Sequence, residues 1–388
     1  MSQAKKERKM GKLIIRILGV LAGLMTLLLV VVKLVFGGGA FYPDLKTKPL
    51  VPAKKVEVLV ELDYPPGMVV TAPGGRIFYT LHPFGKPERF TKAVLFELVN
   101  GKKVPYPSLE AQKKFIGMMG ITIDKQKRLW LINPGQVERR PTRLYAIDLR
   151  KNKVVFEHSF ANGVAGLAQD LRVTKDGKTV ILADTGLMRF TSGALIVFDI
   201  QSKKARTLLK GHPSVMAQNL RMRTKKGTHS IAFGLITFAV GLDGIALTPD
   251  DKWLYYATMS HDSLYRIEMK YLLDEKLNPV ELHKKIEFVS KKPLSDGIEI
   301  DKAGNVYITD VEDGRGLSVV TKDKKLKTVV RDKRMVWADC VHIDEKGAIL
   351  YTDSAIPAYL PPFLTPPTKK TLKANRPYRI YRIQKPKL

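Results

Sequence analysis

A strand–turn–strand unit that recurs six times along the chain is the feature that most constrains the fold. In each copy a short apolar strand leads into a polar turn, and a second apolar strand then ends in Thr, Asp or Asn. The clearest copies are Gly241–Tyr256, Ser295–Asp310 and Ala338–Asp353. Repeats of roughly fifty residues that contain only strands and tight turns are typical of propeller blades. The sequence therefore predicts an all-β fold, a six-bladed β-propeller over residues 56–388.

The copies align at the start of their first strand. The equivalent positions are Pro66, Met119, Gln169, Asp243, Asp296 and Asp339. Each copy also carries an outer hairpin with alternating apolar and polar residues, for example Leu95–Val104 and Leu264–Leu273. A ring of blades must close to hide its edge strands, and we expect the last strand, Tyr378–Ile383, to pair with the first, Val56–Leu62.

One interval between copies is longer than the others. The extra residues lie in the stretch His212–Gly241, between the outer strand of the third copy and the inner strand of the fourth. In a propeller such a connection runs over the face on which the inner strands begin. We therefore expect His212–Gly241 to overhang one mouth of the central channel, as a lid or a wall.

The first forty residues predict a membrane segment. Residues 17–36 are almost entirely apolar, with Lys33 as their one charge, and about 20 such residues span a bilayer. The basic tail, residues 1–16, should stay in the cytoplasm, which places the linker 37–55 and the propeller outside, in the periplasm or extracellular space. A cleaved signal peptide is the alternative, because Gly37–Ala40 are small enough for a cleavage site, and it makes the protein secreted.

The amino-acid composition gives less information about binding partners than the repeat gives about the fold. The net charge is +29, but Lys and Arg are scattered along the chain, so we expect a basic exterior and no specific nucleic-acid binding. The basic end Lys369–Lys387 leaves a polyanion- or envelope-binding module as one alternative function. The single cysteine, Cys340, excludes an intramolecular disulfide, and we expect a monomer.

Seven stretches of the chain, in order, resemble the yellow / major royal jelly protein family, as a bacterial-type member. They are Arg128–Gly135, Pro141–Leu149, Ala183–Gly186, Gly193–Asp199, His212–Val215, Leu242–Pro249 and Leu264–Ile267. The resemblance implies a six-bladed propeller that is usually extracellular. Members of the family include pigmentation proteins, a food protein, salivary amine binders and enzymes that convert dopachrome, so the resemblance defines fold better than function.

The more distant gluconolactonase-like propellers hold a divalent cation with a Glu, two Asn and an Asp at the starts of inner strands. The matching positions here are Pro66, Gln169, Asp243 and Asp296. Two of these four residues, Asp243 and Asp296, are anionic, and Gln169 offers a carbonyl oxygen. Ca²⁺ is therefore a possible cofactor, with Asp243 and Asp296 as its ligands. The missing Glu counts against metal-dependent hydrolysis.

The repeat geometry predicts a binding site. Asp243, Asp296 and Asp339 should converge at one mouth of the channel with Gln169 beside them, and carboxylates so close repel unless a cation or a proton intervenes. Trp337 is the expected aromatic partner for an organic amine. We therefore expect a small cationic or aromatic ligand. A metal-dependent lactonase-like hydrolase and a dopachrome-type isomerase are the enzymatic alternatives.

Other residues are weaker candidates. Three aspartates at the ends of second strands form an expected wider ring, although Asp in such positions often caps a turn; they are Asp184, Asp310 and Asp353. His229 and His261 are possible acid/base groups near the mouth. The sequence contains no Gly-x-Ser-x-Gly elbow, phosphate-binding glycine loop, Cys-x-x-Cys pair or His-Glu-x-x-His helix, so the common nucleophilic, nucleotide and zinc chemistries have no support.

Overall fold

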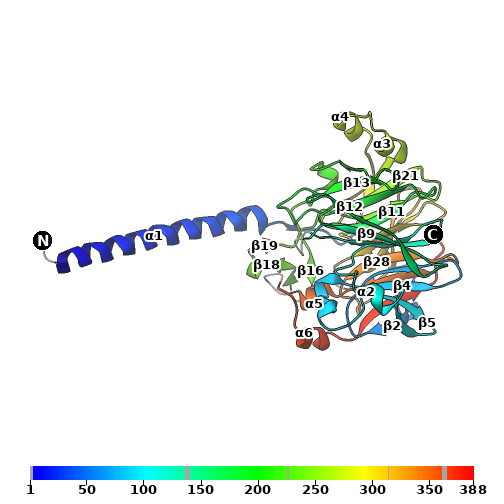
Figure 1. The fold of residues 1–388 in the computed structure, drawn as a ribbon, viewed down its shortest axis with the longest axis horizontal. Coiled ribbons are helices and arrows are strands. Elements are labelled where there is room, and N and C mark those ends of the chain that lie inside the picture. The colour runs from blue at the N-terminus through cyan, green and yellow to red at the C-terminus, as the bar shows by residue number, and fades with distance from the viewer. Residues whose placement is uncertain (1–2, 136–139, 225–226, 313, 361–364) are drawn as a thin grey trace.

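Six four-stranded antiparallel sheets make up most of the computed structural model (Figure 1), which describes residues 3–135, 140–224, 227–312, 314–360 and 365–388. Their innermost strands contact one another in a closed cycle, so the sheets are the blades of one ring. The predicted six-bladed propeller is confirmed.

The strands of each blade are given from the channel outward. The first three blades consist of β3 (Pro66–Thr71), β4 (Ile77–Leu81), β5 (Leu95–Val99) and β6 (Lys102–Pro105); of β7 (Ile121–Ile123), β8 (Arg128–Asn133), β9 (Arg143–Asp148) and β10 (Lys153–Ser159); and of β11 (Ala168–Val173), β12 (Thr179–Asp184), β13 (Ala194–Asp199) and β14 (Ala205–Leu208). The fourth, fifth and sixth blades consist of β20 (Leu242–Leu247), β21 (Trp253–Thr258), β22 (Ser263–Glu268) and β23 (Glu287–Lys291); of β24 (Ile298–Ile300), β25 (Val306–Asp310), β26 (Gly316–Val320) and β27 (Leu326–Val330); and of β28 (Ala338–Ile343), β29 (Ile349–Asp353), β30 (Tyr378–Ile383) and β2 (Glu57–Leu62).

The ring closes as expected, because the outermost strand of the sixth blade comes from the beginning of the propeller. β2 pairs antiparallel with β30, with Glu57 opposite Arg382 and Leu62 opposite Tyr378. The last blade is therefore held together by the two ends of the propeller sequence, which leaves β30 with a partner on each side.

One predicted hairpin is wrong. Residues after β22 do not form its outer partner strand but two short helices, α3 (Met269–Leu273) and α4 (Pro279–His283), and the outer strand β23 follows them. The local reason is capping: Asn278 accepts a hydrogen bond from the Glu281 backbone N–H at 3.0 Å, and Pro279 occupies the first helical position.

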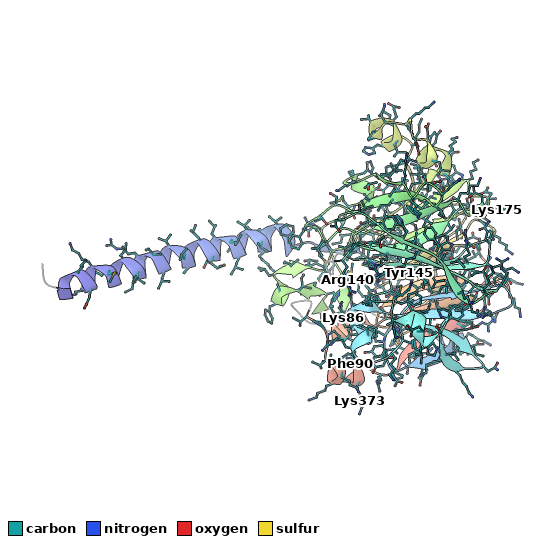
Figure 2. All side chains as sticks on the ribbon, in the orientation of Figure 1. Lys86, Phe90, Arg140, Tyr145, Lys175 and Lys373 are labelled. Atoms are coloured by element: carbon teal, nitrogen blue, oxygen red, sulfur yellow. The ribbon has the colours of Figure 1, made fainter. Side chains whose placement is uncertain are left out.

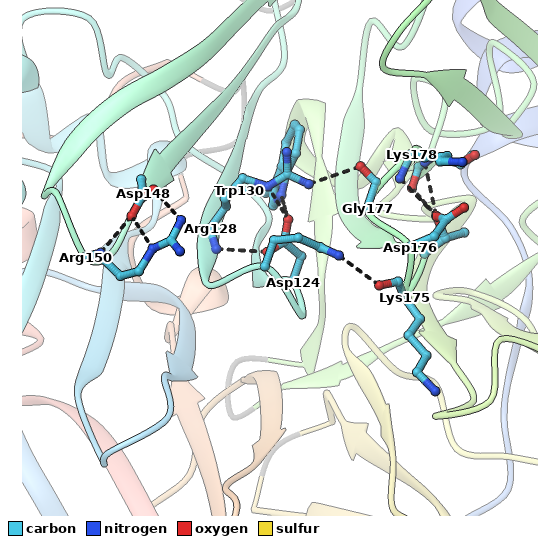
Figure 3. A network of polar contacts seen from close by, with 12 residues as sticks. Asp124, Arg128, Trp130, Asp148, Arg150, Lys175, Asp176, Gly177 and Lys178 are labelled. Carbon is cyan, nitrogen blue, oxygen red and sulfur yellow. Dashed lines mark hydrogen bonds and ion pairs between the residues drawn. The ribbon is translucent and has the colours of Figure 1, made fainter.

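The turns between the inner strands are closed by side chains that the repeat supplies. In the second blade Asp124 accepts hydrogen bonds from the Arg128 backbone N–H at 2.8 Å, from Arg128 Nε at 2.6 Å and from Trp130 Nε1 at 2.7 Å. Arg128 Nη2 also donates to the Gly177 carbonyl at 3.0 Å, which ties the second blade to the third (Figure 3).

The core lies between neighbouring blades. Phe78 and Leu95 of the first blade pack with Leu129 and Tyr145 of the second, and all four side chains are buried. Because each sheet is covered on both faces, its middle strands carry continuous apolar runs rather than strict alternation.

The stretch His212–Gly241 forms an insert above the ring, as the sequence predicted. Its short strands are β15 (Leu220–Arg221), β16 (Arg223–Thr224), β17 (Gly227–Thr228), β18 (Ser230–Ile231) and β19 (Ile236–Thr237). β16 pairs with β17, and β18 pairs with β19.

The N-terminal helix α1 (Gln3–Phe36) extends away from the propeller (Figure 1). Among the described residues it is the one helix long and apolar enough to cross a membrane, over Lys6–Phe36. It is followed by β1 (Ala40–Phe41), which pairs with β15 of the insert. The remaining helices are α2 (Leu109–Gln112), α5 (Ile356–Tyr359) and α6 (Lys369–Ala374).

Candidate functional site

The inner strands share a local irregularity at their start, where the repeat places its candidate residues. The ladder between the two inner strands of a blade shifts register at one point in four blades: between Pro66 and Val69, Ala168 and Asp170, Leu242 and Gly244, and Ala338 and Val341. A β-bulge of this kind releases a residue from the ladder and redirects its side chain. Gln169, Asp243 and Asp339 lie inside these shifts.

A glycine after the aspartate allows the inner strands to approach closely. Gly297 donates its backbone N–H to the Asp339 carbonyl at 2.8 Å, and a Cβ at position 297 would lie 2.7 Å from that same oxygen. The Asp296-Gly297 pair of the repeat therefore has two roles: the aspartate faces the channel, and the glycine packs the fifth blade against the sixth.

The inner-strand starts line a cavity of about 50 Å³ beneath the insert. Four of the five residues predicted to bind a ligand are part of its lining, namely Gln169, Asp243, Asp296 and Asp339. Since a single water needs about 10–15 Å³ by the same measure, the cavity holds a few waters or one small group. The rest of its lining is mostly apolar and includes Met68, Phe84, Met119, Phe238 and Met259.

The three aspartates at this cavity are buried and influence one another. Burial raises the pKa of Asp243 well above its usual value, and the carboxylates of Asp296 and Asp339 raise it further. Burial raises the pKa of Asp296 to about 7, although Trp337 Nε1 donates to its Oδ2 at 2.7 Å and favours the ionised form. Burial and the neighbouring Asp296 likewise raise the pKa of Asp339 well above its usual value. Three full negative charges are thus unfavourable here without a compensating cation.

Asp339 has an incompletely satisfied carboxylate. Its Oδ2 atom lies 3.5 Å from His82 Nε2 and has no hydrogen-bond partner among the described residues. Burial lowers the pKa of His82 to about 3, so its imidazole is neutral at physiological pH and supplies no positive charge. Because the Phe84 N–H donates to His82 Nδ1 at 3.2 Å, the neutral ring carries its hydrogen on Nε2 and directs it toward Asp339 at a long distance, so this carboxylate can accept a stronger donor.

Two charged residues near the cavity were not predicted from the sequence. Lys292 is fully buried, and its Nζ donates to the Pro293 carbonyl at 3.1 Å and to Ser295 Oγ at 2.9 Å. Burial lowers its pKa to about 7, while the carboxylate of Asp243 is among the charges that oppose the shift. Asp170, next to Gln169, also lines the cavity. The repeat pattern did not point to either residue, because Lys292 precedes the fifth blade and Asp170 lies one position after the aligned residue Gln169.

Trp337 is placed differently from the expectation that it contacts a ligand. Its side chain is fully buried, lies outside the described cavity lining, and supports Asp296 from behind through the indole N–H. The ring of His229, from the insert, lies 4.3 Å from Phe238 and 5.5 Å from Trp337. Burial lowers the pKa of His229 to about 3. The aromatic wall of the cavity is instead Phe84 and Phe238.

The wider ring of aspartates serves the turns. Asp353 accepts hydrogen bonds from the backbone N–H groups of Trp337, Val336 and Ala355, at 2.9, 3.0 and 3.1 Å. Asp184 accepts one from the Gly186 N–H at 2.9 Å. Asp184, Asp310 and Asp353 are not among the described residues that line the cavity. These three residues act as caps, which was the structural alternative for them.

The remaining candidates lie away from the cavity. His261 Nδ1 accepts a hydrogen bond from the Ser263 N–H at 3.1 Å, and burial lowers the pKa of His261 to about 4. Cys340 is a buried free thiol. With respect to metals, the described part of the chain contains no group of three or more His, Cys, Asp or Glu side chains arranged to hold an ion. Asp243 and Asp296 are thus two neighbouring carboxylates and not a complete set of metal ligands.

An ionic network lies next to the cavity. Arg172 Nη1 lies 2.6 Å from Asp170 Oδ1, and its Nη2 lies 3.8 Å from Glu299 Oε2. Asp170 Oδ2 accepts the Ile245 backbone N–H at 3.0 Å, and His342 Nδ1 lies 3.6 Å from Glu299 Oε2. This network joins the inner strands of the third, fourth, fifth and sixth blades through polar side chains.

Comparisons with known proteins agree with this architecture. The solved structures that resemble the chain include a gluconolactonase from Xanthomonas campestris, with a TM-score of 0.52, 13% identity, and coverage of 77% of this chain and 86% of that one. A luciferin-regenerating enzyme matches with a TM-score of 0.50 and 11% identity, over 85% of this chain and 94% of that one. At such identities the likeness shows the fold alone.

Sequence comparison is more specific. A search of curated proteins found no match. The sequence model described as major royal jelly protein matches residues 116–364, which run from the second blade into the sixth. Because this match covers well over half of the chain, the protein belongs to the major royal jelly protein family.

Proposed function

We propose that this propeller binds a small organic cation, with the positive group among Asp243, Asp296 and Asp339. The observation that carries the proposal is Asp339, which lines the cavity and whose buried Oδ2 atom forms no hydrogen bond with a described residue, with His82 Nε2 3.5 Å away. An ammonium group supplies both the donor and the charge that this oxygen lacks.

The electrostatics of the site favour a cation over a neutral ligand. The carboxylates of Asp296 and Asp339 raise the pKa of Asp243, and that of Asp296 raises the pKa of Asp339. Burial lowers the pKa of Lys292 and so weakens the positive charge that it can supply. Any positive group that enters the cavity therefore relieves repulsion as well as forming hydrogen bonds. The same coupling predicts that protons leave the carboxylates when the cation binds.

The walls of the cavity favour an organic cation over a hydrated metal ion. Thioether and aromatic side chains, which include Met119, Met259 and Phe238, face the carboxylates across the cavity. Aromatic faces and polarisable sulfur atoms attract alkylammonium groups and pack against carbon. A hard divalent ion instead prefers several oxygen ligands arranged around it, and the described residues include no group of three or more His, Cys, Asp or Glu side chains arranged in that way.

The size of the cavity limits what enters. About 50 Å³ accommodates a primary ammonium group with one or two carbons, so the rest of a larger ligand must lie toward the insert. Phe238 and Val240, which belong to the insert, line the cavity and would contact that part of the ligand.

The proposal includes a location outside the cytoplasm. It is supported by the long apolar helix α1, with basic residues on the N-terminal side of its apolar stretch. Retention of α1 gives a membrane-anchored binding protein, whereas its removal gives a secreted one.

Acid–base catalysis is the second candidate function. It is favoured by the pKa values of Asp296 and Lys292, which burial brings to about 7 in both cases. Groups that titrate near neutrality can exchange protons with a substrate. Turnover of a lactone or an oxidised catechol by the parent protein, with loss in Asp296→Asn, would establish this candidate.

Calorimetric titration tests the binding proposal. Primary alkyl- and arylalkylamines should bind the parent protein, and neutral alcohols with the same carbon skeletons should not. Asp243→Asn, Asp296→Asn and Asp339→Asn each remove one carboxylate and should weaken amine binding about tenfold or more. Asp184→Asn, which alters a turn cap outside the cavity lining, is the matched control.

Measurements of proton release and of Ca²⁺ binding distinguish an organic cation from a metal ion as the ligand. Titrations near pH 6.5 in buffers of different ionisation enthalpy should show protons released with the amine. Equal amine affinity in the parent and all three cavity variants would rule the proposal out. If Ca²⁺ binds instead, and Asp243→Asn and Asp296→Asn abolish its binding, the ligand is a metal and not an organic cation.

A further inference from the structure

We infer that the propeller face that carries the cavity mouth lies against the membrane, with the tip of the insert in the lipid headgroup layer. The partner is the surface of the bilayer that α1 crosses. The inference rests on the proposed membrane anchor and on how α1 is attached to the insert, and it is independent of which ligand the cavity takes.

The end of α1 is held by the insert through several contacts. Lys33 Nζ donates to the Gly234 carbonyl, and Thr237 Oγ1 donates to the Gly38 carbonyl at 2.9 Å. The ring of Phe36 lies 4.5 Å from the ring of Phe190. Directly after the helix, β1 pairs in parallel with β15. The helix therefore ends on the insert and not on a free linker.

Two glycines make this attachment tight. A Cβ on Gly37 would lie 2.1 Å from the Leu235 carbonyl oxygen, and a Cβ on Gly39 would lie 2.5 Å from the Asn219 carbonyl oxygen. Gly39 also has a φ of +111°, which is unfavourable for other residues. The backbone of the linker thus packs directly against the backbone of the insert, which leaves little freedom between helix and propeller.

The segment that holds α1 also lines the cavity. Thr237 contacts Gly38 through its side chain, and the next residue, Phe238, is part of the cavity wall. β18 and β19 lie beside the end of α1 (Figure 1). When α1 spans the bilayer up to Phe36, the insert is at the level of the headgroups, and the mouth beneath it faces the membrane.

The insert and its neighbours present apolar side chains at this level. Phe233 is 78% exposed, Phe190 is 45% exposed and Leu187 is 38% exposed. Ala232 and Phe233 both adopt left-handed backbone conformations, with φ of 49° and 55°, a pairing that is costly for residues other than glycine. Exposed apolar side chains beside the end of a membrane-spanning helix are suited to contact with a lipid surface.

Cationic and aromatic groups also lie where β1 meets the insert. The guanidinium groups of Arg221 and Arg223 lie 4.2 and 4.7 Å from the ring centre of Phe41, and Arg223 is in addition ion-paired with Glu312 at 3.2 Å, so Arg221 is the cation offered to headgroups here. Figure 2 shows Lys373 on the half of the propeller from which α1 extends. Aromatic rings and basic side chains are the usual anchors at the membrane–water boundary, where anionic headgroups attract the positive charges.

Spin labels on the full-length protein test this orientation. The native Cys340 is 2% exposed, so labels attach selectively to introduced cysteines. Phe233→Cys reports on the insert tip, Leu21→Cys on the middle of α1, and Val280→Cys, at an exposed site on α4, serves as the matched control away from the insert. Each protein is placed in nanodiscs that contain anionic lipid. The measurement is the ratio of collision rates with oxygen, which concentrates in lipid, and with a water-soluble nickel chelate.

The expected ratio at position 233 is severalfold above that at position 280 and approaches that at position 21. Leu187→Cys provides a second site near the tip if Phe233→Cys does not fold. Equal ratios at 233, 187 and 280 would overturn the inference, as would removal of α1 from the mature protein. Shielding of position 233 from both reagents would mean that a protein, such as a second copy, covers the tip, and this too would overturn it.

Discussion

At the scale of single residues, aspartates in this propeller have two different tasks. Asp353 lies at the end of a second strand and accepts three backbone N–H groups, so its charge is matched by donors within the chain. Asp339 lies at the bulge of the first strand of the same blade, with one oxygen lacking a donor among the described residues. The first arrangement stabilises a turn, whereas the second opposes folding and is suited to a ligand.

Substitution of these two aspartates should affect stability in opposite directions. Asp353→Ala leaves three backbone donors without an acceptor and should lower the free energy of unfolding by about 2–3 kcal/mol. Asp339→Asn removes a buried charge and should leave stability unchanged or raise it at pH 7.5. Thermal melting of the detergent-solubilised protein compares the two. A larger loss for Asp339→Asn than for Asp353→Ala would contradict the division of tasks.

The pH dependence of stability has a definite sign at Asp296. Burial raises its pKa from the ordinary 3.8 to about 7, so the folded protein holds a proton that the unfolded chain has lost between these values. The contribution of Asp296 to the free energy of unfolding is fully present below pH 4 and is lost as the pH rises through 7. Lys292, whose pKa is lowered to about 7, is charged in both states at the acidic end of this range and adds a slope of opposite sign only as the pH approaches 7.

The measurable consequence is a change of slope between pH 4.5 and 7. Without ligand, the melting temperature of the parent should fall toward pH 7, and Asp296→Asn should flatten this fall because asparagine does not titrate. The remaining slope comes from other aspartates whose pKa burial raises, such as Asp310. A variant with the same slope as the parent would show that Asp296 is ionised throughout.

At the scale of elements, the insert joins three parts of the molecule. It pairs with β1, receives the end of α1 and contributes Phe238 to the cavity. None of its strands is longer than two residues, so its conformation depends on these contacts and not on its own ladders.

The attachment of α1 predicts unequal effects of three neighbouring glycines. Gly37→Ala and Gly39→Ala place a Cβ within 2.1 and 2.5 Å of insert carbonyl oxygens, whereas Gly38→Ala meets nothing closer than 3.7 Å. The first two should therefore open the pairing of β1 with β15, and the third should not. Hydrogen exchange at the Ala40 amide, which donates to the Asn219 carbonyl, should accelerate about tenfold or more in the first two variants.

Exchange at the amides of the propeller core is the internal control and should be equal in all three variants. Faster exchange in Gly38→Ala, or unchanged exchange in Gly39→Ala, would mean that α1 is not held in the way described.

At the scale of the whole molecule, stability depends on closure of the ring. The sixth blade takes its outer strand β2 from the start of the propeller, so loss of the β2–β30 pairing exposes an edge and separates the two ends of the domain.

Two substitutions in β2 separate closure from surface effects. Leu62 is 4% exposed and packs in the core with Tyr378, so Leu62→Ala should cost about 2–4 kcal/mol of unfolding free energy. Val58, in the same strand, is 39% exposed, and Val58→Ala should cost less than about 0.5 kcal/mol. The melting temperature should therefore fall by several degrees for the first and hardly for the second. Equal losses would show that closure does not depend on burial of β2.

The sequence alone determined the number of blades, the closing strands and the position of the insert. These properties follow from local chemistry, because turn residues such as Asp124 act on donors within a few positions and apolar runs report burial on both faces of a sheet. The same repeat also determined which residues begin the inner strands, and so which carboxylates meet at the channel.

Tertiary structure decided the surroundings of those carboxylates. His82 and Asp170 come to the cavity from different blades, Lys292 interacts electrostatically with Asp243 from the connection after the fourth blade, and no local pattern records that meeting. Trp337 lies behind Asp296 because its side-chain direction is set by packing with Phe238 and not by its distance in sequence from Asp339. The orientation of the mouth toward α1 likewise arises from contacts between residues about two hundred positions apart, such as Gly38 and Thr237.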